Sequence, residues 1–260
     1  MTSQLLDPIP IVLVFVLFAI ATLACYEVGF RIGRWWQDRE PGEQEGPTEM
    51  LVGSLLALMA FLLAVTMGMA SERFDARRGL VLAEANAISA VYLQADYLPD
   101  PAASDLKELV RQYLPLRIVE DPAQIQADIA ASMALHPQMW TIVSETAREG
   151  YLSDLMSSLG DSVTELINLN ESRMVAGLYA RVPETVLLLL LAGSALSLGM
   201  VGYSAGLRRR RSVLSAIVMV VALGVVLAIV IDLDRPRDGF IQVSQQALKD
   251  VQMWIGPPTE

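Results

Sequence analysis

Four apolar runs, at about residues 9–30, 50–70, 185–207 and 213–231, divide this chain. An apolar helix of ~20 residues crosses a hydrocarbon core of ~30 Å because a helix rises ~1.5 Å per residue. The runs form two pairs, and residues 73–184 separate the pairs. The sequence therefore predicts an all-α protein with four transmembrane helices and a helical extramembrane domain inserted between spans two and three. The predicted segments are a hairpin (1–72), the insert (73–184), a second hairpin (185–231) and a short tail (232–260).

The insert has helical periodicity. One helix face, with residues four and three positions apart, runs from Glu84 to Leu98 and is apolar after Glu84, and a second amphipathic stripe runs from Leu152 to Met174. The first stripe predicts a helix that continues from span two. His136-Pro137 interrupts the pattern, so we expect His136 in a loop or at a helix end.

Charge and composition restrict the classes of partner and of site. The insert carries nine basic and sixteen acidic residues, which argues against nucleic acid as a partner. One histidine and one cysteine exclude an intrachain disulfide and a zinc site built from Cys and His within one chain. The sequence shows no nucleophile elbow, phosphate-binding glycine loop or metal-ligand spacing. We therefore expect no enzyme activity, metal or cofactor.

Arginines in two short loops predict the orientation. The loop after span one holds Arg31, Arg34 and Arg39, and the loop after span three holds Arg208–Arg211. Arginine clusters in short loops favour the cytoplasmic side, although further arginines flank the insert. The expected location is a bacterial inner membrane, with the insert and both termini in the periplasm. Trp35 and Trp36 lie where interfacial aromatic anchors are expected.

Two glutamates are candidates for function. Glu27, near the end of span one, lies four residues before Arg31. It is either an interfacial ion pair or a functional ionisable group within a span. Glu84 lies on an apolar stripe and needs a cationic partner, for which Arg73, Arg77 and Arg78 are the candidates. The alternatives for Glu84 are a structural ion pair and a gate at the mouth of a pore.

Further polar candidates lie nearby or close span four. Asn86 has the chemistry to cap or bridge helices, and Asn170 to fix the register of a helix pair. We expect Asp232 and Asp234 to pair with the arginines after span two. The predicted gate or polar network comprises Glu27, Arg31, Arg73, Asp75, Arg77, Arg78, Glu84, Asn86, Asp232, Asp234 and Arg235.

Small residues four apart mark span three as a packing surface. Those predicted to pack are Gly193, Ser197, Gly199, Gly202 and Gly206. Within one subunit we expect this surface to dock on span two or span four, and between subunits it would build a homo-oligomer.

Two motifs and the end of span one resemble a known family. The first motif begins at Ser71 and reads Ser-Glu-Arg-Phe-Asp-Ala-Arg-Arg-Gly-Leu-Val-Leu-Ala-Glu-Ala-Asn-Ala-Ile. The second begins at Ile231 and reads Ile-Asp-Leu-Asp-Arg-Pro-Arg-Asp-Gly-Phe-Ile-Gln-Val-Ser-Gln-Gln. With Glu27-Val28-Gly29-Phe30-Arg31, they resemble the bestrophin-like domain family of bacterial and plant membrane proteins.

The resemblance implies a function. Bestrophins are pentameric chloride channels with four spans and a helical domain between spans two and three, so it implies a homo-oligomer in the lipid bilayer that conducts chloride or another small anion. Bestrophins keep this domain and their termini in the cytoplasm, opposite to the orientation that the arginines predict. If the protein is a channel, we expect span two to line the pore through Leu55, Leu58, Leu62 and Thr66 or a neighbouring face. The alternative is a non-conducting scaffold or sensor whose acidic domain binds a partner.

Overall fold

The computed structural model describes residues 9–40, 45–119, 121, 123–150, 154–178, 181–235 and 239–258. In those ranges the chain is all-α and contains no strand, which confirms the predicted class. The helices are α1 (Ile11–Arg39), α2 (Glu45–Gln94), η1 (Ala95–Tyr97), α3 (Ala102–Tyr113), η2 (Pro115–Arg117), α4 (Ile125–Arg148), α5 (Asp154–Leu178), α6 (Glu184–Leu207), α7 (Val213–Asp234) and α8 (Gln246–Ile255).

Four of these helices, α1, α2, α6 and α7, are long and apolar enough to cross a membrane. They contain the four predicted spans. Helix α1 continues past the predicted end of span one to Arg39. Helix α2 runs without a break from Glu45 to Gln94, as the stripe after span two predicted.

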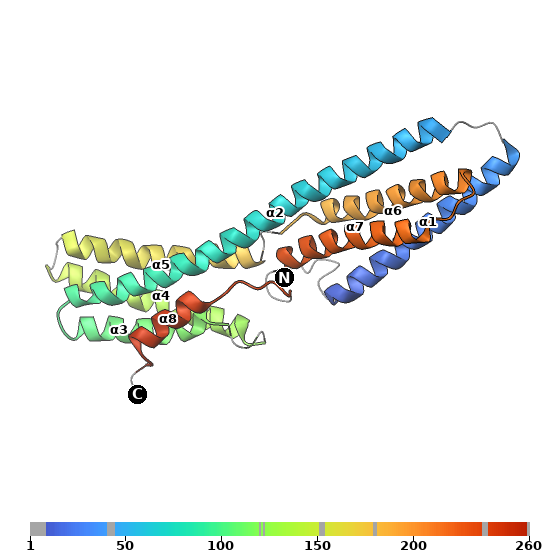
Figure 1. Cartoon of the computed structure of the whole chain (residues 1–260). Helices are drawn as coiled ribbons and strands as arrows, with labels where there is room; N and C mark the ends of the chain where they lie inside the picture. Colours follow the sequence, from blue (N-terminus) through green and yellow to red (C-terminus); the bar gives the residue numbers. More distant parts are fainter. Residues whose placement is uncertain are drawn as a thin grey trace. The chain divides into compact units, whose positions relative to one another are not determined.

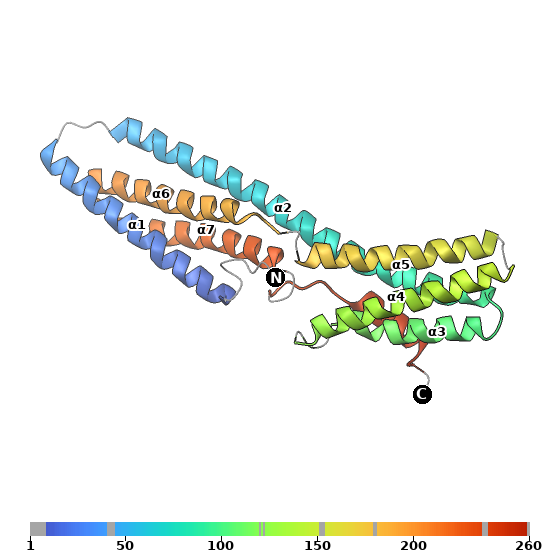
Figure 2. The same cartoon turned by 180° about the vertical axis from the view of Figure 1, so that it is seen from behind.

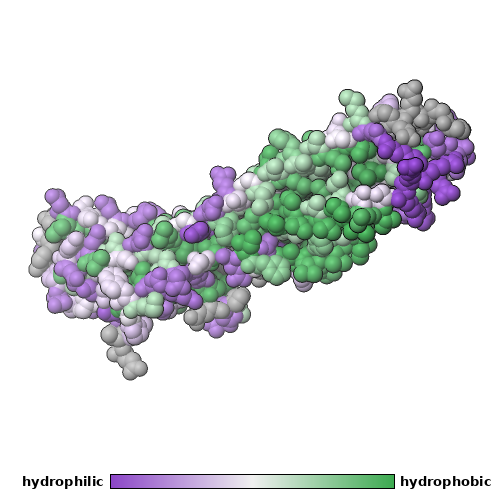
Figure 3. Space-filling model, in the orientation of Figure 1, coloured by the Kyte–Doolittle hydropathy of each residue, from purple (hydrophilic) through white to green (hydrophobic). Residues whose placement is uncertain are grey.

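The chain forms two compact units, and the first is built from the membrane spans. It comprises Met1–Phe74 and Ala180–Gln242. Within it α1 packs along α6 and α7 (Figures 1 and 2). Its core includes Phe18, Met59, Leu190 and Leu227. Much of the outer face of this unit is hydrophobic (Figure 3), as the contact of spans with lipid requires.

Close backbone contact joins α6 to α1. A Cβ atom added at Gly202 would lie 2.0 Å from the carbonyl oxygen of Tyr26, and one at Gly206 would lie 2.3 Å from that of Phe30. Both distances are far below van der Waals contact, so only glycine permits this approach. The sequence predicted span two or span four as the partner of these small residues. For Gly202 and Gly206 that partner was wrong: it is span one.

The other small residues of α6 differ in their surroundings. Gly193 lies against the Met59 sulfur of α2. Gly199 lies near the Cys25 carbonyl oxygen of α1, and Ser197 is buried. Two opposite faces of α6 therefore use small residues, because 193 and 202 are nine positions, ~180°, apart on a helix with ~100° per residue.

The second unit is a helical domain that comprises Asp75–Tyr179 and Val243–Glu260. Its core is formed by side chains such as Ile88, Leu106, Met139 and Val163. The C-terminal tail, predicted as a separate segment, contributes to this core through the fully buried Leu248.

Helix α4 passes through Pro137 without interruption. The expectation that His136 lies in a loop or at a helix end was therefore wrong. Proline removes one helical hydrogen bond and costs about 3 kcal/mol in a helix interior. One face of α4 nevertheless stays buried, through Ser132, His136, Met139 and Val143. Burial of that face outweighs the local penalty, which sequence periodicity alone does not measure.

Candidate functional site

A carboxylate held by two guanidinium groups lies inside the helical domain. Glu84 of α2 is fully buried. Its Oε1 accepts a hydrogen bond from Arg117 Nε at 2.7 Å and one from the Tyr113 hydroxyl at 3.0 Å. Its Oε2 pairs with Arg173 of α5. We call Glu84, Tyr113, Arg117 and Arg173 the Glu84 cluster, and it ties α2 to α3, η2 and α5.

The Glu84 cluster carries a net positive charge because two guanidinium groups share one carboxylate. Arg117 is 6% exposed and the Arg173 side chain 14%. Arg117 also donates to the Ser132 hydroxyl at 3.4 Å. Burial raises the pKa of Tyr113, and the nearby Glu84 carboxylate raises it further. Tyr113 therefore stays protonated and acts as a hydrogen-bond donor.

His136 borders the Glu84 cluster. Its ring centroid lies 5.5 Å from that of Tyr113. Burial lowers the pKa of His136, the positive charge of Arg117 lowers it further, and Glu84 opposes the change. No hydrogen-bond partner for His136 Nε2, or for Asn170 Oδ1 on α5, is found among the described residues. Burial with an unpaired Nε2 beside a guanidinium disfavours the protonated imidazole, so protonation of His136 at low pH should destabilise this part of the domain.

The buried position of Glu84 was predicted, but its cationic partners were not. Glu84 pairs with Arg117 and Arg173, not with Arg73, Arg77 or Arg78 as expected. Sequence reasoning missed Arg117, although it stands alone among apolar residues in Pro-Leu-Arg-Ile-Val. A lone charge in an apolar stretch is the signal that would have found it.

The remaining members of the first motif vary in burial. Arg77 is buried, and the pairing of Asp232 and Asp234 with the arginines after span two stays a prediction. Arg73 is half-buried, whereas Asp75, Arg78 and Asn86 are exposed. Because Asn86 is exposed, it does not bridge two helices within the chain, which was one of its predicted roles.

The acidic residues at the end of α7 bind backbone groups in the membrane unit. Asp232 accepts hydrogen bonds from the backbone N–H groups of Phe240 and Ile241, at 2.8 and 2.9 Å. Asp234 accepts from the Val182 N–H at 2.7 Å and pairs with Arg181 Nε at 3.3 Å. The two carboxylates thus hold the end of α7 against the segment that precedes α6 and the segment that follows α7.

Arg235 is also buried and donates to the carbonyl oxygen of Ile9 at 2.7 Å. Arg235 therefore fastens the start of span one to the end of span four. Residues Pro236 to Asp238 of the second motif lie outside the described residues.

Glu27 forms the predicted ion pair with Arg31, at 2.8 Å from carboxylate to guanidinium. The same carboxylate also lies 2.8 Å from Arg211 in the loop after α6. The Glu27 side chain is 34% exposed. These contacts support an interfacial ion pair, in which Glu27 links α1 to the loop after α6.

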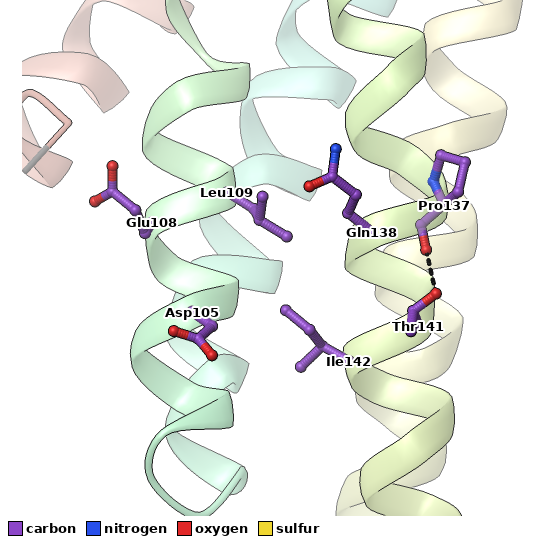
Figure 4. A pocket seen from close by; sticks show the side chains of 7 residues that line it. All are labelled: Asp105, Glu108, Leu109, Pro137, Gln138, Thr141 and Ile142. Atoms are coloured by element: carbon purple, nitrogen blue, oxygen red, sulfur yellow. Dashed lines mark hydrogen bonds between the residues drawn. The ribbon is translucent and has the colours of Figure 1, made fainter.

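A groove of about 500 Å³ lies between α3 and α4 on the surface of the helical domain. Leu109 and Ile142 point toward each other across it, and Asp105 and Glu108 project from α3 (Figure 4). An open groove with an apolar floor and an acidic rim suits a basic or amphipathic segment better than an enclosed small molecule. In the part of the chain that is described, no three His, Cys, Asp or Glu side chains cluster as a metal site requires.

Comparison with known proteins identifies the family. No curated protein matches the chain. Two variants of a bacterial bestrophin homologue from Klebsiella pneumoniae have similar folds. One is 13% identical, with a TM-score of 0.67 over 93% of this chain and 97% of that one. The other is 14% identical, with a TM-score of 0.67 over 94% and 97%.

A further solved membrane protein is 15% identical, with a TM-score of 0.65 over 94% of this chain and 96% of its own. At these identities the similarity establishes the fold alone. The family model for the bestrophin-like domain matches residues 15–248, nearly the whole chain. Because the motifs, the four spans and this match agree, the chain belongs to the bestrophin-like domain family.

Proposed function

We propose that this protein is a homo-oligomeric anion channel of the bacterial inner membrane, with chloride or another small anion as the permeant ion, and that it is not an enzyme. The observation that carries the proposal is a stripe of mostly small residues on the exposed face of α2, comprising Ser54, Ala57, Phe61, Ala64 and Gly68. We call it the α2 stripe. Its members lie three or four positions apart and so share one helix face.

The composition of the α2 stripe differs from that of a face made for lipid. The exposed face of α1 carries large aliphatic side chains such as Val12, Leu17 and Ile20. The α2 stripe has one large side chain, Phe61, which is 64% exposed; the exposed large aliphatic residues of span two, Leu51, Leu58 and Val65, lie along one edge of it. Small residues suit contact with a second copy of the chain or the wall of a pore. Both uses require assembly.

Of the pore face expected from the sequence, Leu58 is 53% exposed, Leu55 and Leu62 are half-buried, and Thr66 is the exception. Thr66 is buried within the single chain and donates its hydroxyl to its own helix, at the Leu62 carbonyl oxygen. Thr66 therefore does not present its hydroxyl to an ion, and the neighbouring face of α2 is the better candidate. The acidic insert opposes anion entry, so the proposal needs a direct test.

The test is ion flux through the purified protein in sealed liposomes, with chloride and cation gradients measured separately. We expect chloride flux above that of empty liposomes. Phe61→Ala should raise this flux about twofold or more by widening a hydrophobic constriction, and Phe61→Glu should lower the chloride preference. Leu17→Ala, on the exposed face of α1, is the matched control and should leave flux unchanged.

Protein-bearing liposomes that show no flux at either polarity would refute the channel. Equal effects of Phe61→Ala and Leu17→Ala would refute the α2 stripe as the pore wall while leaving conduction established. The oligomeric state is measured on the same sample by mass photometry in detergent, and a single-chain mass would exclude assembly.

We further propose that the insert and both termini face the periplasm, supported by Arg208–Arg211 and by the arginines after span one. The test labels cysteines introduced into a chain whose single cysteine has been replaced. In a Cys25→Ser background, Asp161→Cys on α5 should react with a membrane-impermeant maleimide in intact cells with a permeabilised outer membrane. Arg210→Cys should react only after lysis. The reverse pattern would place the helical domain in the cytoplasm.

The second candidate function is a non-conducting scaffold or sensor, which the acidic groove between α3 and α4 favours. In that case the wild-type protein binds a basic amphipathic peptide, and Asp105→Lys combined with Glu108→Lys abolishes this binding. Neither protein conducts ions in liposomes. Unchanged peptide binding would refute it.

A further inference from the structure

Ion pairs line the junction between the end of α1 and the loop after α6. Arg211 lies 2.8 Å from the Glu27 carboxylate, and Arg209 pairs with Asp38. Arg208 pairs with Glu49 at the start of α2. Three of the four consecutive arginines in this loop are therefore matched by acids within the membrane unit.

Arg34 interrupts this pattern on α1. At ~100° per residue, positions 27, 34 and 38 fall within about 40° of one another, so Arg34 lies on the same face as both acids and between them along the helix. Its backbone is fixed beside the end of α6, since a Cβ at Gly206 would lie 2.8 Å from Arg34 N. Its nearest acid along the helix, Asp38, already pairs with Arg209.

Arg210 stands in the loop between Arg209 and Arg211, whose acidic partners Asp38 and Glu27 flank Arg34 on α1. Both Arg34 and Arg210 are exposed. Within the described part of the chain, neither guanidinium has an acidic partner. Glu40 follows α1 with a non-helical backbone and forms no ion pair with Arg34 among the described residues. Two unmatched cations thus stand in a row of otherwise paired charges.

Aromatic residues beside this row indicate its depth in the membrane. Trp35 and Trp36 are 49% and 38% exposed, and the Arg39 guanidinium lies 4.1 Å from the Trp35 ring centroid. Exposed tryptophans next to the end of a span are typical of the lipid headgroup layer. Hydrophilic residues gather at this end of the membrane unit (Figure 3).

We propose that Arg34 and Arg210 together bind the phosphate of an anionic phospholipid headgroup, with Trp35 and Trp36 against the acyl–headgroup boundary. Guanidinium groups bind phosphate oxygens through paired N–H donors. A phosphodiester between the two arginines would give them the anionic partner that the neighbouring arginines already have in their ion pairs. A net-neutral headgroup brings its own cation and so matches the pair less well. This site is independent of ion conduction.

Two measurements on the full-length protein in detergent micelles test the proposal. The first is the thermal unfolding midpoint with added phosphatidylglycerol, phosphatidylcholine or sodium phosphate. The second is retained lipid by native mass spectrometry from a mixture of the two lipids. We expect phosphatidylglycerol to raise the midpoint and to be retained in preference. The Arg34→Gln/Arg210→Gln variant should lose at least half of the midpoint shift and most of the preference.

Two variants separate lipid binding from general charge and from misfolding. Arg148→Gln removes an exposed arginine at the end of α4 and should keep the wild-type response. Arg34→Lys/Arg210→Lys should recover part of the lipid preference, because the positive charge remains. Equal lipid retention by the wild-type protein and the double glutamine variant would overturn the proposal. So would an equal midpoint shift from sodium phosphate, which would assign the two arginines to a soluble anion.

Discussion

The Nε atom of Arg117 lies 2.7 Å from Oε1 of Glu84, a residue 33 positions earlier in the chain. Both side chains are buried. Removing one partner of a buried ion pair leaves the other charge without compensation and costs about 3–5 kcal/mol. The contact therefore constrains how α2 packs against the segment that follows α3.

Replacement of Glu84 is expected to destabilise the protein. Glu84→Gln keeps the size of the side chain but leaves Arg117 and Arg173 with no anion, so we expect a loss of about 3 kcal/mol or more. Urea unfolding of the purified protein, followed by circular dichroism, measures it. Glu165→Gln, an exposed acid on α5, is the control and should change stability by less than about 0.5 kcal/mol. Equal effects of the two changes would contradict a buried charge cluster.

Substitution in the contact between α1 and α6 should separate the two helices. At Gly206 even alanine brings a Cβ against the backbone of Phe30, so we expect Gly206→Ala to cost about 1–3 kcal/mol, as overpacking does. Gly160→Ala on α5, where no atom lies within 4 Å of the added Cβ, should be neutral or slightly stabilising. The thermal midpoint in detergent compares the variants, and a neutral Gly206→Ala would show that the helices separate at little cost.

His136 makes the stability of the helical domain depend on pH. Because burial lowers its pKa in the folded state, the unfolded chain binds the proton more readily. Stability is then retained above the unfolded pKa of ~6.5 and falls as the pH drops below it. His136→Asn should flatten the pH dependence of the unfolding midpoint between pH ~7 and ~5. His136 is the only histidine of the chain, so an unchanged profile would assign that dependence to carboxylates.

Asp234 holds the entry to α6 against the end of α7. Asp234→Ala removes the carboxylate that accepts from the Val182 N–H and pairs with Arg181, so we expect a loss of about 2–4 kcal/mol. Asp234→Asn keeps an acceptor and should cost less. Hydrogen exchange of the Val182 amide provides a local measure. Wild-type protection of that amide in Asp234→Ala would show that other contacts fix this junction.

Several features of the fold could be predicted from the sequence because they depend on neighbouring residues. Hydropathy over about 20 consecutive positions located the four spans, and three- to four-residue periodicity identified the helix that continues from span two. The Glu27–Arg31 pair is one helical turn apart, so its spacing was sufficient to predict it. Pro137 shows the limit of local rules, since burial of one face of α4 outweighs its helix-breaking effect.

The sequence by itself determined that this chain is an all-α membrane protein of the bestrophin-like domain family and that Glu84 faces an interior. Only the tertiary structure decided that Arg117 and Arg173 compensate Glu84, that α1 is the partner of the glycines at the end of α6, and that Arg34 and Arg210 stand among paired charges. The physical reason is that hydropathy and helical periodicity are properties of consecutive residues. The partner of a charge or of a small residue instead depends on which distant segments come together, and many arginines in the sequence are chemically equivalent candidates.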